Sequence, residues 1–233
     1  MIQIEKIQMA GEESAVRKPA GAIFDMDGTL LDSMFYWRQA PEDCLRAVYG
    51  KEPGTTDVME QMKAMTIGEG SAWLKETFSL PDSAGQIAAH INEMMEQFYS
   101  SRVQVKPGAE RWLQNLAEAG IPMAVATSTD RSLVETALHR TGLERYFGAV
   151  FTCTEVGAGK GRPDVYEAAL AFLGTPRSDT WVFEDSLFAM RTAAAAGFPV
   201  AGVYDDSQKT LQAEVRAAVD FYIPAFDAVE PPV

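Results

Sequence analysis

Asp25 and Asp27 stand one residue apart, directly after a short apolar run, Ala22–Phe24, whose length suits a buried strand. Bringing two like charges together out of water is unfavourable unless something neutralises them. A divalent cation would do so, and paired carboxylates suit a hard ion such as Mg²⁺. Gly28 follows at once and lets the chain turn sharply after the pair. The pair therefore indicates a metal-dependent site at the end of a strand.

The D-x-D-G stretch has two other interpretations, an ordinary turn and a calcium loop. Ordinary turns also contain Asp and Gly, because Asp side chains bond to nearby backbone groups, so the pair alone does not decide. A calcium loop also begins D-x-D, but it requires Gly at its sixth position and Glu at its twelfth. Those positions hold Leu30 and Tyr36, which excludes a calcium loop. Ser33, just beyond, is expected to cap the next helix.

Three later stretches carry polar side chains in comparable positions. They are Thr127 with Ser128 after the apolar run 123–126, Lys160 in G-A-G-K-G-R-P-D just before Pro163, and Glu184 with Asp185 after the run 181–183. Taken singly, these stretches are typical of a helix cap, a solvated surface lysine and a strand-end turn. Because ligand sites in open parallel sheets lie at the carboxyl ends of the strands, we expect Asp25, Thr127 and Asp185 to reach the same rim.

This ordered set resembles the haloacid dehalogenase superfamily, and within it the helical-cap members that include phosphoglycolate phosphatase and β-phosphoglucomutase. The resemblance consists of D-x-D-G-T, a hydroxyl after a second strand, a lysine, and paired acids after a third strand, and it covers roughly Ala20 to Val203. It implies an Mg²⁺-dependent phosphomonoester hydrolase that acts on a small phosphorylated metabolite through an aspartyl-phosphate intermediate.

The resemblance also implies which residues perform the phosphoryl transfer. Asp25 would be the nucleophile, and Asp27 would be the general acid and base. Thr127 and Ser128 would bind the phosphoryl oxygens, with the Ser128 amide at a helix start. Lys160 would neutralise both the nucleophile and the transferring group. The predicted catalytic residues are therefore Asp25, Asp27, Thr127 and Lys160.

A metal site is implied by the same resemblance. Mg²⁺ would lie between Asp25, Asp185, the main-chain carbonyl of Asp27 and the phosphoryl group. Glu184 would assist from outside this group or act as an alternate ligand. The expected cofactor is Mg²⁺.

Two alternatives to hydrolysis stay open at this point: a sugar phosphomutase of the β-phosphoglucomutase type, and a catalytically silent binding protein on the same fold. A mutase must bind a second phosphate, and arginine is well suited to bind it. The mutases that the chain resembles carry arginine where Ile67 follows Thr66, histidine where Trp37 stands, and commonly valine where Thr29 stands. These departures favour a phosphatase, and the intact site residues argue against a silent protein.

The elements around these motifs predict an α/β fold. Strands are expected up to Asp25 and at about 122–127, 149–152, 180–183, 200–203 and 220–223. Helices are expected around Trp112, after a capping box at Ser132 and Glu135, and at 163–173, 187–196 and 211–218. This alternation predicts a Rossmann-like, doubly wound parallel sheet with helices on both faces.

An all-helical cap is expected between the first strand and the rest of the core. The core would comprise residues 20–33 and 104–233, the cap residues 34–103, and an N-terminal extension residues 1–19. Pro41 is expected to interrupt or restart the first cap helix. A stripe of Val58, Met59, Met62 and Met65 is expected to face the core of the cap, because flexible thioethers fill irregular interiors.

Composition limits the cellular setting and the partners. The chain has 233 residues, of which 47% are hydrophobic, and its formal net charge is −13. Such a charge argues against binding to nucleic acid or to an anionic membrane, since both are polyanions. The N-terminus does not resemble a signal peptide, and two cysteines without CxxC spacing suit reduced thiols, so we expect a cytoplasmic protein. We expect a small phosphorylated metabolite as partner and a monomer or weak homodimer.

Overall fold

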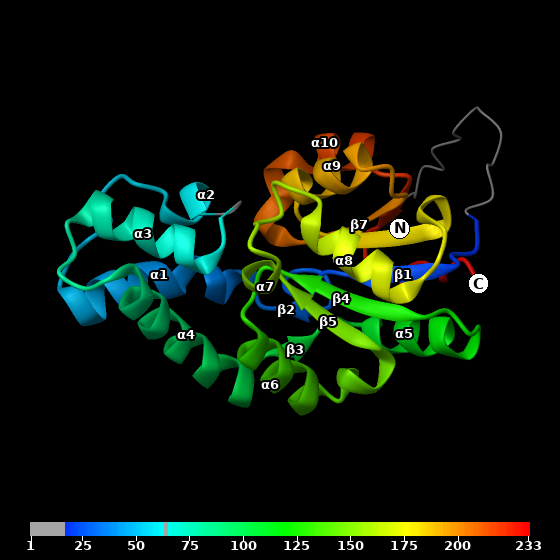
Figure 1. Cartoon of the computed structure of the whole chain (residues 1–233), viewed down its shortest axis with the longest axis horizontal. Helices are drawn as coiled ribbons and strands as arrows, with labels where there is room; N and C mark the ends of the chain where they lie inside the picture. Colours follow the sequence, from blue (N-terminus) through cyan, green and yellow to red (C-terminus); the bar gives the residue numbers. More distant parts are fainter. Residues whose placement is uncertain (1–16, 63–64) are drawn as a thin grey trace, which may run out of the picture.

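The computed structural model describes residues 17–62 and 65–233 (Figure 1). Apart from residues 17–19, the predicted N-terminal extension lies outside the described residues. Figure 1 shows a layered α/β body on one side of the molecule and a group of helices, α1 to α4, on the other.

The centre of the α/β body is a sheet in which, within the described residues, six strands pair in parallel in the order β5-β4-β1-β6-β7-β8. The strands are β1 (Gly21–Phe24), β4 (Met123–Thr127), β5 (Ala149–Thr152), β6 (Thr180–Glu184), β7 (Val200–Val203) and β8 (Phe221–Ile223). All residues of β1, β4, β6 and β7 are buried, as in a parallel sheet covered on both faces. The predicted Rossmann-like α/β fold is confirmed.

Helices cover both faces of this sheet. One layer contains α5 (Ala109–Glu118) and α6 (Arg131–Thr141), and the other contains α8 (Asp164–Leu173), α9 (Leu187–Ala195) and α10 (Gln212–Ala218). Because successive strand residues face opposite sides, Phe24 of β1 packs with the first layer and Ile23 with the second. Short helical turns complete the body: η1 (Leu143–Tyr146), α7 (Cys153–Val156), η2 (Arg177–Asp179) and η3 (Asp206–Leu211).

The helices between the first strand and the rest of the core are α1 (Met34–Tyr49), α2 (Val58–Met62), α3 (Ile67–Phe78) and α4 (Ala84–Ser101). They occupy the stretch in which the sequence predicts a cap, and the exact domain limits stay a prediction. The chain leaves and re-enters the core through a short antiparallel pair, β2 (Leu31–Asp32) and β3 (Gln104–Val105). Two-residue strands are too short to leave a periodic pattern, so the sequence did not predict this pair.

Two local predictions about the helices were wrong. Helix α1 runs through Pro41 without a break, because Pro41 belongs to its buried face and packing outweighs the lost hydrogen bond. The capping box at Ser132 and Glu135 does not form, because α6 begins earlier, with Asp130 at its N-cap. Glu135 instead pairs with Arg131, 3.5 Å away.

No helix of the described ranges, 17–62 and 65–233, has the length and apolar character that crossing a membrane requires.

The stacked rings of Phe24 and Phe183 join the two central strands, β1 and β6, with ring centroids 4.2 Å apart. Phe183 is 1% exposed, so Phe183→Ala is expected to lower the free energy of unfolding by about 3–5 kcal/mol, as truncation of a buried aromatic ring does. Urea denaturation followed by circular dichroism measures this loss.

Phe172→Ala is the matched control, because the Phe172 ring is 52% exposed, and less than about 1 kcal/mol should be lost. Equal losses for the two variants would contradict the assignment of Phe183 to the centre of the core.

Candidate active site

The carboxyl ends of the central strands meet at one rim of the sheet, and a cavity opens there. All the residues predicted to form the site line this cavity: Asp25, Asp27, Thr127, Ser128, Lys160, Glu184 and Asp185. Asp25 directly follows β1, while Thr127 and Glu184 end β4 and β6. Lys160 lies on the loop before α8. The parallel topology thus brings together residues that are far apart in the sequence.

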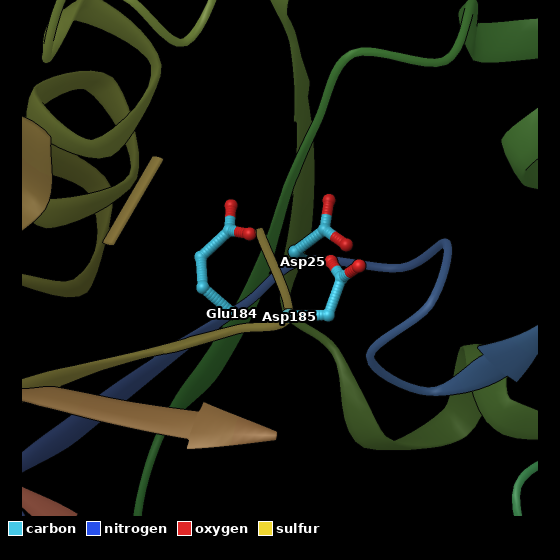
Figure 2. Close-up of side chains that lie close together, drawn as sticks. All are labelled: Asp25, Glu184 and Asp185. Atoms are coloured by element: carbon cyan, nitrogen blue, oxygen red, sulfur yellow. The ribbon is translucent and has the colours of Figure 1, made fainter. Parts of the chain in front are cut away.

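Three of the carboxylates that line the cavity lie close together (Figure 2). Each of the three side chains is buried and places one carboxylate oxygen within 4.8 Å of the others. The residues are Asp25, Glu184 and Asp185. Oδ2 of Asp185 is buried and has no hydrogen-bond partner among the described residues. A buried carboxylate oxygen without a partner is costly, so this atom is a natural ligand for a cation.

The ammonium group of Lys160 is the counterion of two of these carboxylates. Its Nζ donates hydrogen bonds to Asp25 and to Oε1 of Glu184, the latter at 2.5 Å. Tyr166 also donates to Oε1 of Glu184, at 2.8 Å. Burial by itself lowers the pKa of Lys160, but Asp25 and Glu184 more than offset this effect, and the pKa is raised. Lys160 is therefore a permanent cation at neutral pH.

The remaining charge of the cluster fits a divalent cation. Burial raises the pKa of Glu184 to about 7, with Lys160 opposing and Asp25 adding to the increase. Burial, followed by the charges of Asp25 and Glu184, holds the pKa of Asp185 well above its ordinary value. When all three carboxylates are ionised, Lys160 balances only one of them. Hard oxygen ligands with this excess of negative charge suit an ion such as Mg²⁺.

Gly28 is required where it stands. Its φ of +84° lies in the left-handed region, which L side chains rarely adopt. A Cβ atom there would also lie 2.5 Å from Oδ2 of Asp185 and 2.7 Å from Cγ of Met34. The turn after the Asp pair therefore packs directly against the carboxylate of Asp185, which no larger residue would permit.

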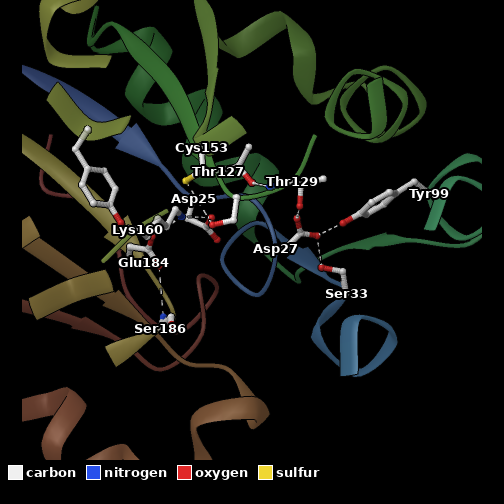
Figure 3. A network of polar contacts seen from close by, with 12 residues as sticks. Asp25, Asp27, Ser33, Tyr99, Thr127, Thr129, Cys153, Lys160, Glu184 and Ser186 are labelled. Carbon is white, nitrogen blue, oxygen red and sulfur yellow. Dashed lines mark hydrogen bonds and ion pairs between the residues drawn. The ribbon is translucent and has the colours of Figure 1, made fainter. Parts of the chain in front are cut away.

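Asp27 has a different environment from Asp25, as Figure 3 shows. Its Oδ1 accepts hydrogen bonds from Ser33 Oγ, at 2.6 Å, and from the hydroxyl of Tyr99. Its Oδ2 accepts one from Thr129 Oγ1, at 2.7 Å. Burial and then the charge of Asp25 raise the pKa of Asp27, while the three hydrogen bonds act in the opposite direction. The raised pKa favours the protonated form of Asp27 more than in an ordinary aspartate.

These partners of Asp27 were missed by sequence reasoning. Ser33 does stand at the N-cap of α1, but its hydroxyl makes no cap bond and binds Asp27 instead, so the predicted capping role was wrong. Thr129 belongs to the hydroxyl-rich stretch after β4, so its place in the site could have been predicted from the sequence. Tyr99 lies 72 residues from Asp27, on an amphipathic helix, and nothing in the sequence indicated their contact.

The two hydroxyl residues predicted to bind phosphate lie beside this network. Oγ1 of Thr127 accepts a hydrogen bond from the Thr129 amide, at 3.1 Å, so its own proton is free to donate into the cavity. The Ser128 hydroxyl lies 3.6 Å from Sγ of Cys153. Their roles in phosphate binding stay a prediction.

Helices of the cap also line the cavity. In the methionine stripe, Val58 and Met62 are buried and Met59 and Met65 are half-buried, and all three methionines line the cavity. The prediction that the stripe faces the cap's core therefore holds only in part. Arg38 of α1 also lines the cavity and was missed by sequence reasoning, which considered only the stretch after Thr66.

The comparisons with known proteins agree with this geometry. A family model described as a haloacid dehalogenase-like hydrolase matches residues 19–197. A Drosophila melanogaster protein named as a probable pseudouridine-5′-phosphatase is 33% identical over 227 residues, covering 91% of this chain and 97% of that protein. A Thermotoga maritima phosphorylated carbohydrates phosphatase is 29% identical over 201 residues, covering 84% of this chain and 92% of that protein.

Among solved structures, CbbY from Rhodobacter sphaeroides in complex with phosphate superimposes with a TM-score of 0.79. The match has 23% sequence identity and covers 89% of this chain and 95% of that chain. It shows a shared fold.

The hydrogen bond from Tyr99 to Asp27 is expected to contribute measurably to stability. Tyr99→Phe removes a buried donor to a carboxylate, and also the acceptor of the Trp37 indole N–H at 2.8 Å. The free energy of unfolding should fall by about 1.5–3 kcal/mol, the range for hydrogen bonds to charged groups. Chemical denaturation at pH 7 measures the loss.

Tyr49→Phe provides the control, since the Tyr49 hydroxyl also donates to a carboxylate, that of Asp82, at 2.8 Å but nearer the surface. This variant should lose less than about 1 kcal/mol. If both variants lost the same amount, the buried network around Asp27 would not have the strength assigned to it.

Proposed function

This chain belongs to the haloacid dehalogenase-like hydrolase family, and from that premise we propose that it hydrolyses a phosphomonoester of a small molecule with Mg²⁺, through a phosphorylated Asp25. The observation that carries the proposal is the buried carboxylate of Asp25, which lies at a strand end against the ammonium of Lys160 and beside two further acids. A phosphate ester resists attack because its own charge repels nucleophiles, so a hydrolase must supply positive charge and an in-line nucleophile.

In the first half of the reaction, a carboxylate oxygen of Asp25 attacks phosphorus. The bond from phosphorus to the alcohol oxygen breaks as the bond to Asp25 forms. Lys160, which already contacts Asp25, offsets negative charge on both the nucleophile and the transferring group. Thr127 donates its hydroxyl proton to a phosphoryl oxygen, and Ser128 binds the same group beside it.

Asp27 moves the protons. As a carboxylic acid it protonates the departing alkoxide, and as a carboxylate it then removes a proton from the water that attacks the aspartyl-phosphate. This second attack breaks the Asp25–phosphorus bond and releases inorganic phosphate. The raised pKa of Asp27 and its fixed position under three hydrogen bonds support this role.

The carboxylate cluster would hold the metal. Asp25, Asp185 and the main-chain carbonyl of Asp27 are the proposed ligands. Glu184 is engaged by Lys160 and Tyr166 and would orient the cluster from one side. When bound, Mg²⁺ supplies positive charge that stabilises the phosphoryl group during transfer.

Hydrolysis is proposed over phosphomutase activity. The relative with the highest identity reported above is named as a phosphatase, and the matching family model describes hydrolases. The argument from the missing cap arginine has less weight than the sequence suggested, because Arg38 lines the cavity from α1. A catalytically silent protein is disfavoured, since nothing in the site is missing: nucleophile, acid, lysine and acidic cluster all face one cavity.

The identity of the nucleophile can be tested by substitution. Asp25→Asn is expected to lower phosphate release from 4-nitrophenyl phosphate by about a thousandfold or more, because an amide cannot form the covalent intermediate. Asp27→Asn should slow turnover of alkyl phosphates, whose leaving groups need a proton. Asp43→Asn, on the exposed face of α1, should leave the rate unchanged. A near wild-type rate for folded Asp25→Asn would refute the assignment.

Metal dependence can be tested by chelation and reconstitution. Exhaustive removal of divalent ions should abolish phosphate release, and Mg²⁺ should restore it. Ca²⁺ should restore little, because it prefers more ligands and looser geometry and could take both oxygens of Asp25 away from phosphorus. The measurement is the initial rate as a function of metal concentration, and full activity in the chelated enzyme would exclude the metal's role.

A further inference from the structure

One part of the cavity lining is apolar. Its side chains come from the cap and from the start of α9: Met34, Trp37, Met59, Met65, Ile67 and Phe188. They line the same cavity as the catalytic residues, so one molecule can have its phosphoryl group at the strand ends and its other end against this wall. We call these six residues the apolar wall.

Polar side chains outside the catalytic set also line the cavity, and some of them are already engaged. They are Arg38, Glu60, Thr66, Ser186, Ser207 and Gln208. The Trp37 indole N–H donates to Tyr99, at 2.8 Å, which leaves the apolar ring surface for contact. The Thr66 hydroxyl is held in a capping box with Glu69. Within the described ranges, Arg38 makes no hydrogen bond or ion pair, so its guanidinium is available to an oxygen atom of a bound molecule.

This lining discriminates between classes of alcohol. A polyol would lose its hydrogen bonds to water where it lies against methionine, isoleucine and phenylalanine, and could regain them only at the polar positions of the lining. A flat ring would instead gain from burial and from thioether and aromatic contacts. Methionines are also adaptable, which suits a planar group that must enter and leave.

We propose that the substrate is a phosphomonoester whose alcohol carries a flat ring, and that this ring lies against Trp37, Met59 and Met65. The proposal rests on the phosphatase function proposed above and adds the chemical class of the leaving group. One relative is named for a phosphate that carries a flat ring, pseudouridine 5′-phosphate, and the other for phosphorylated carbohydrates. The apolar part of the cavity lining favours the first class for this chain.

Two pairs of phosphate esters test this class with the full chain and Mg²⁺. Uridine 5′-monophosphate is compared with ribose 5-phosphate, and 2-phenylethyl phosphate with glycerol 3-phosphate. Both members of each pair are esters of primary alcohols, and only the first member of each carries a flat ring. The flat-ring member of at least one pair should have a kcat/KM at least about tenfold higher, a typical discrimination by an apolar pocket.

If the members without a flat ring were hydrolysed as well as their partners in both pairs, the inference about the flat ring would be wrong while the phosphatase proposal survived. If none of the four esters, nor 4-nitrophenyl phosphate, released phosphate with Mg²⁺ present, the phosphatase proposal itself would fail. The two failures are therefore distinct.

Substitutions in the apolar wall locate the ring. Met65→Gln keeps the length of the side chain but adds an amide, so kcat/KM for the flat-ring ester should fall about fivefold or more, with the ester that lacks a flat ring unchanged. Met65→Leu should retain the preference. Met94→Gln is the matched control, because Met94 is also half-buried but does not line the cavity. An equal effect of Met65→Gln on both esters would place the ring elsewhere and overturn the proposal.

Discussion

The repulsion among buried carboxylates at the sheet rim is the constraint on which the rest of the structure depends. Asp25, Glu184 and Asp185 are held close together out of water, where like charges repel strongly. Lys160 offsets part of this repulsion, and the unpartnered Oδ2 of Asp185 marks where positive charge is still lacking. A rigid parallel sheet, held by stacked aromatic rings between β1 and β6, keeps the acids in place despite their repulsion.

Asp27 lies outside the cluster of three carboxylates, and its hydrogen-bond partners are hydroxyl groups. Two of them belong to the core, but Tyr99 belongs to the last cap helix, α4. The same helix is attached to the core by Asn92, which donates to Asp130 at 2.8 Å, and by the Tyr99 carbonyl, which accepts from Arg140 at 2.7 Å. The position of the cap and the environment of Asp27 are therefore physically linked, and in the proposed mechanism a movement of the cap would change the group that transfers protons.

The sequence was informative where structure is determined locally and uninformative where distant segments meet. Apolar runs predicted the strands closely, and β5 and β7 have the bounds that the pattern indicated. Asp25 and Asp185 were found because strand ends in a parallel sheet share a rim. Tyr99 and Arg38 could not be found, because their helical pattern says which face is apolar but not what lies opposite. Pro41 misled for a related reason, since burial outweighed its helix-breaking tendency.

The antiparallel pair of β2 and β3 has an evolutionary consequence. It sets Leu31 opposite Val105 and Asp32 opposite Gln104, so the helical segment begins and ends at neighbouring points. A segment with adjoining ends can be lengthened, shortened or replaced without rethreading the sheet, much as loops tolerate insertion. Such a replacement would leave the strand-end residues of the core in place. Tyr99 limits this freedom, because any replacement helix must still present a donor to Asp27 or leave that carboxyl group with one partner fewer.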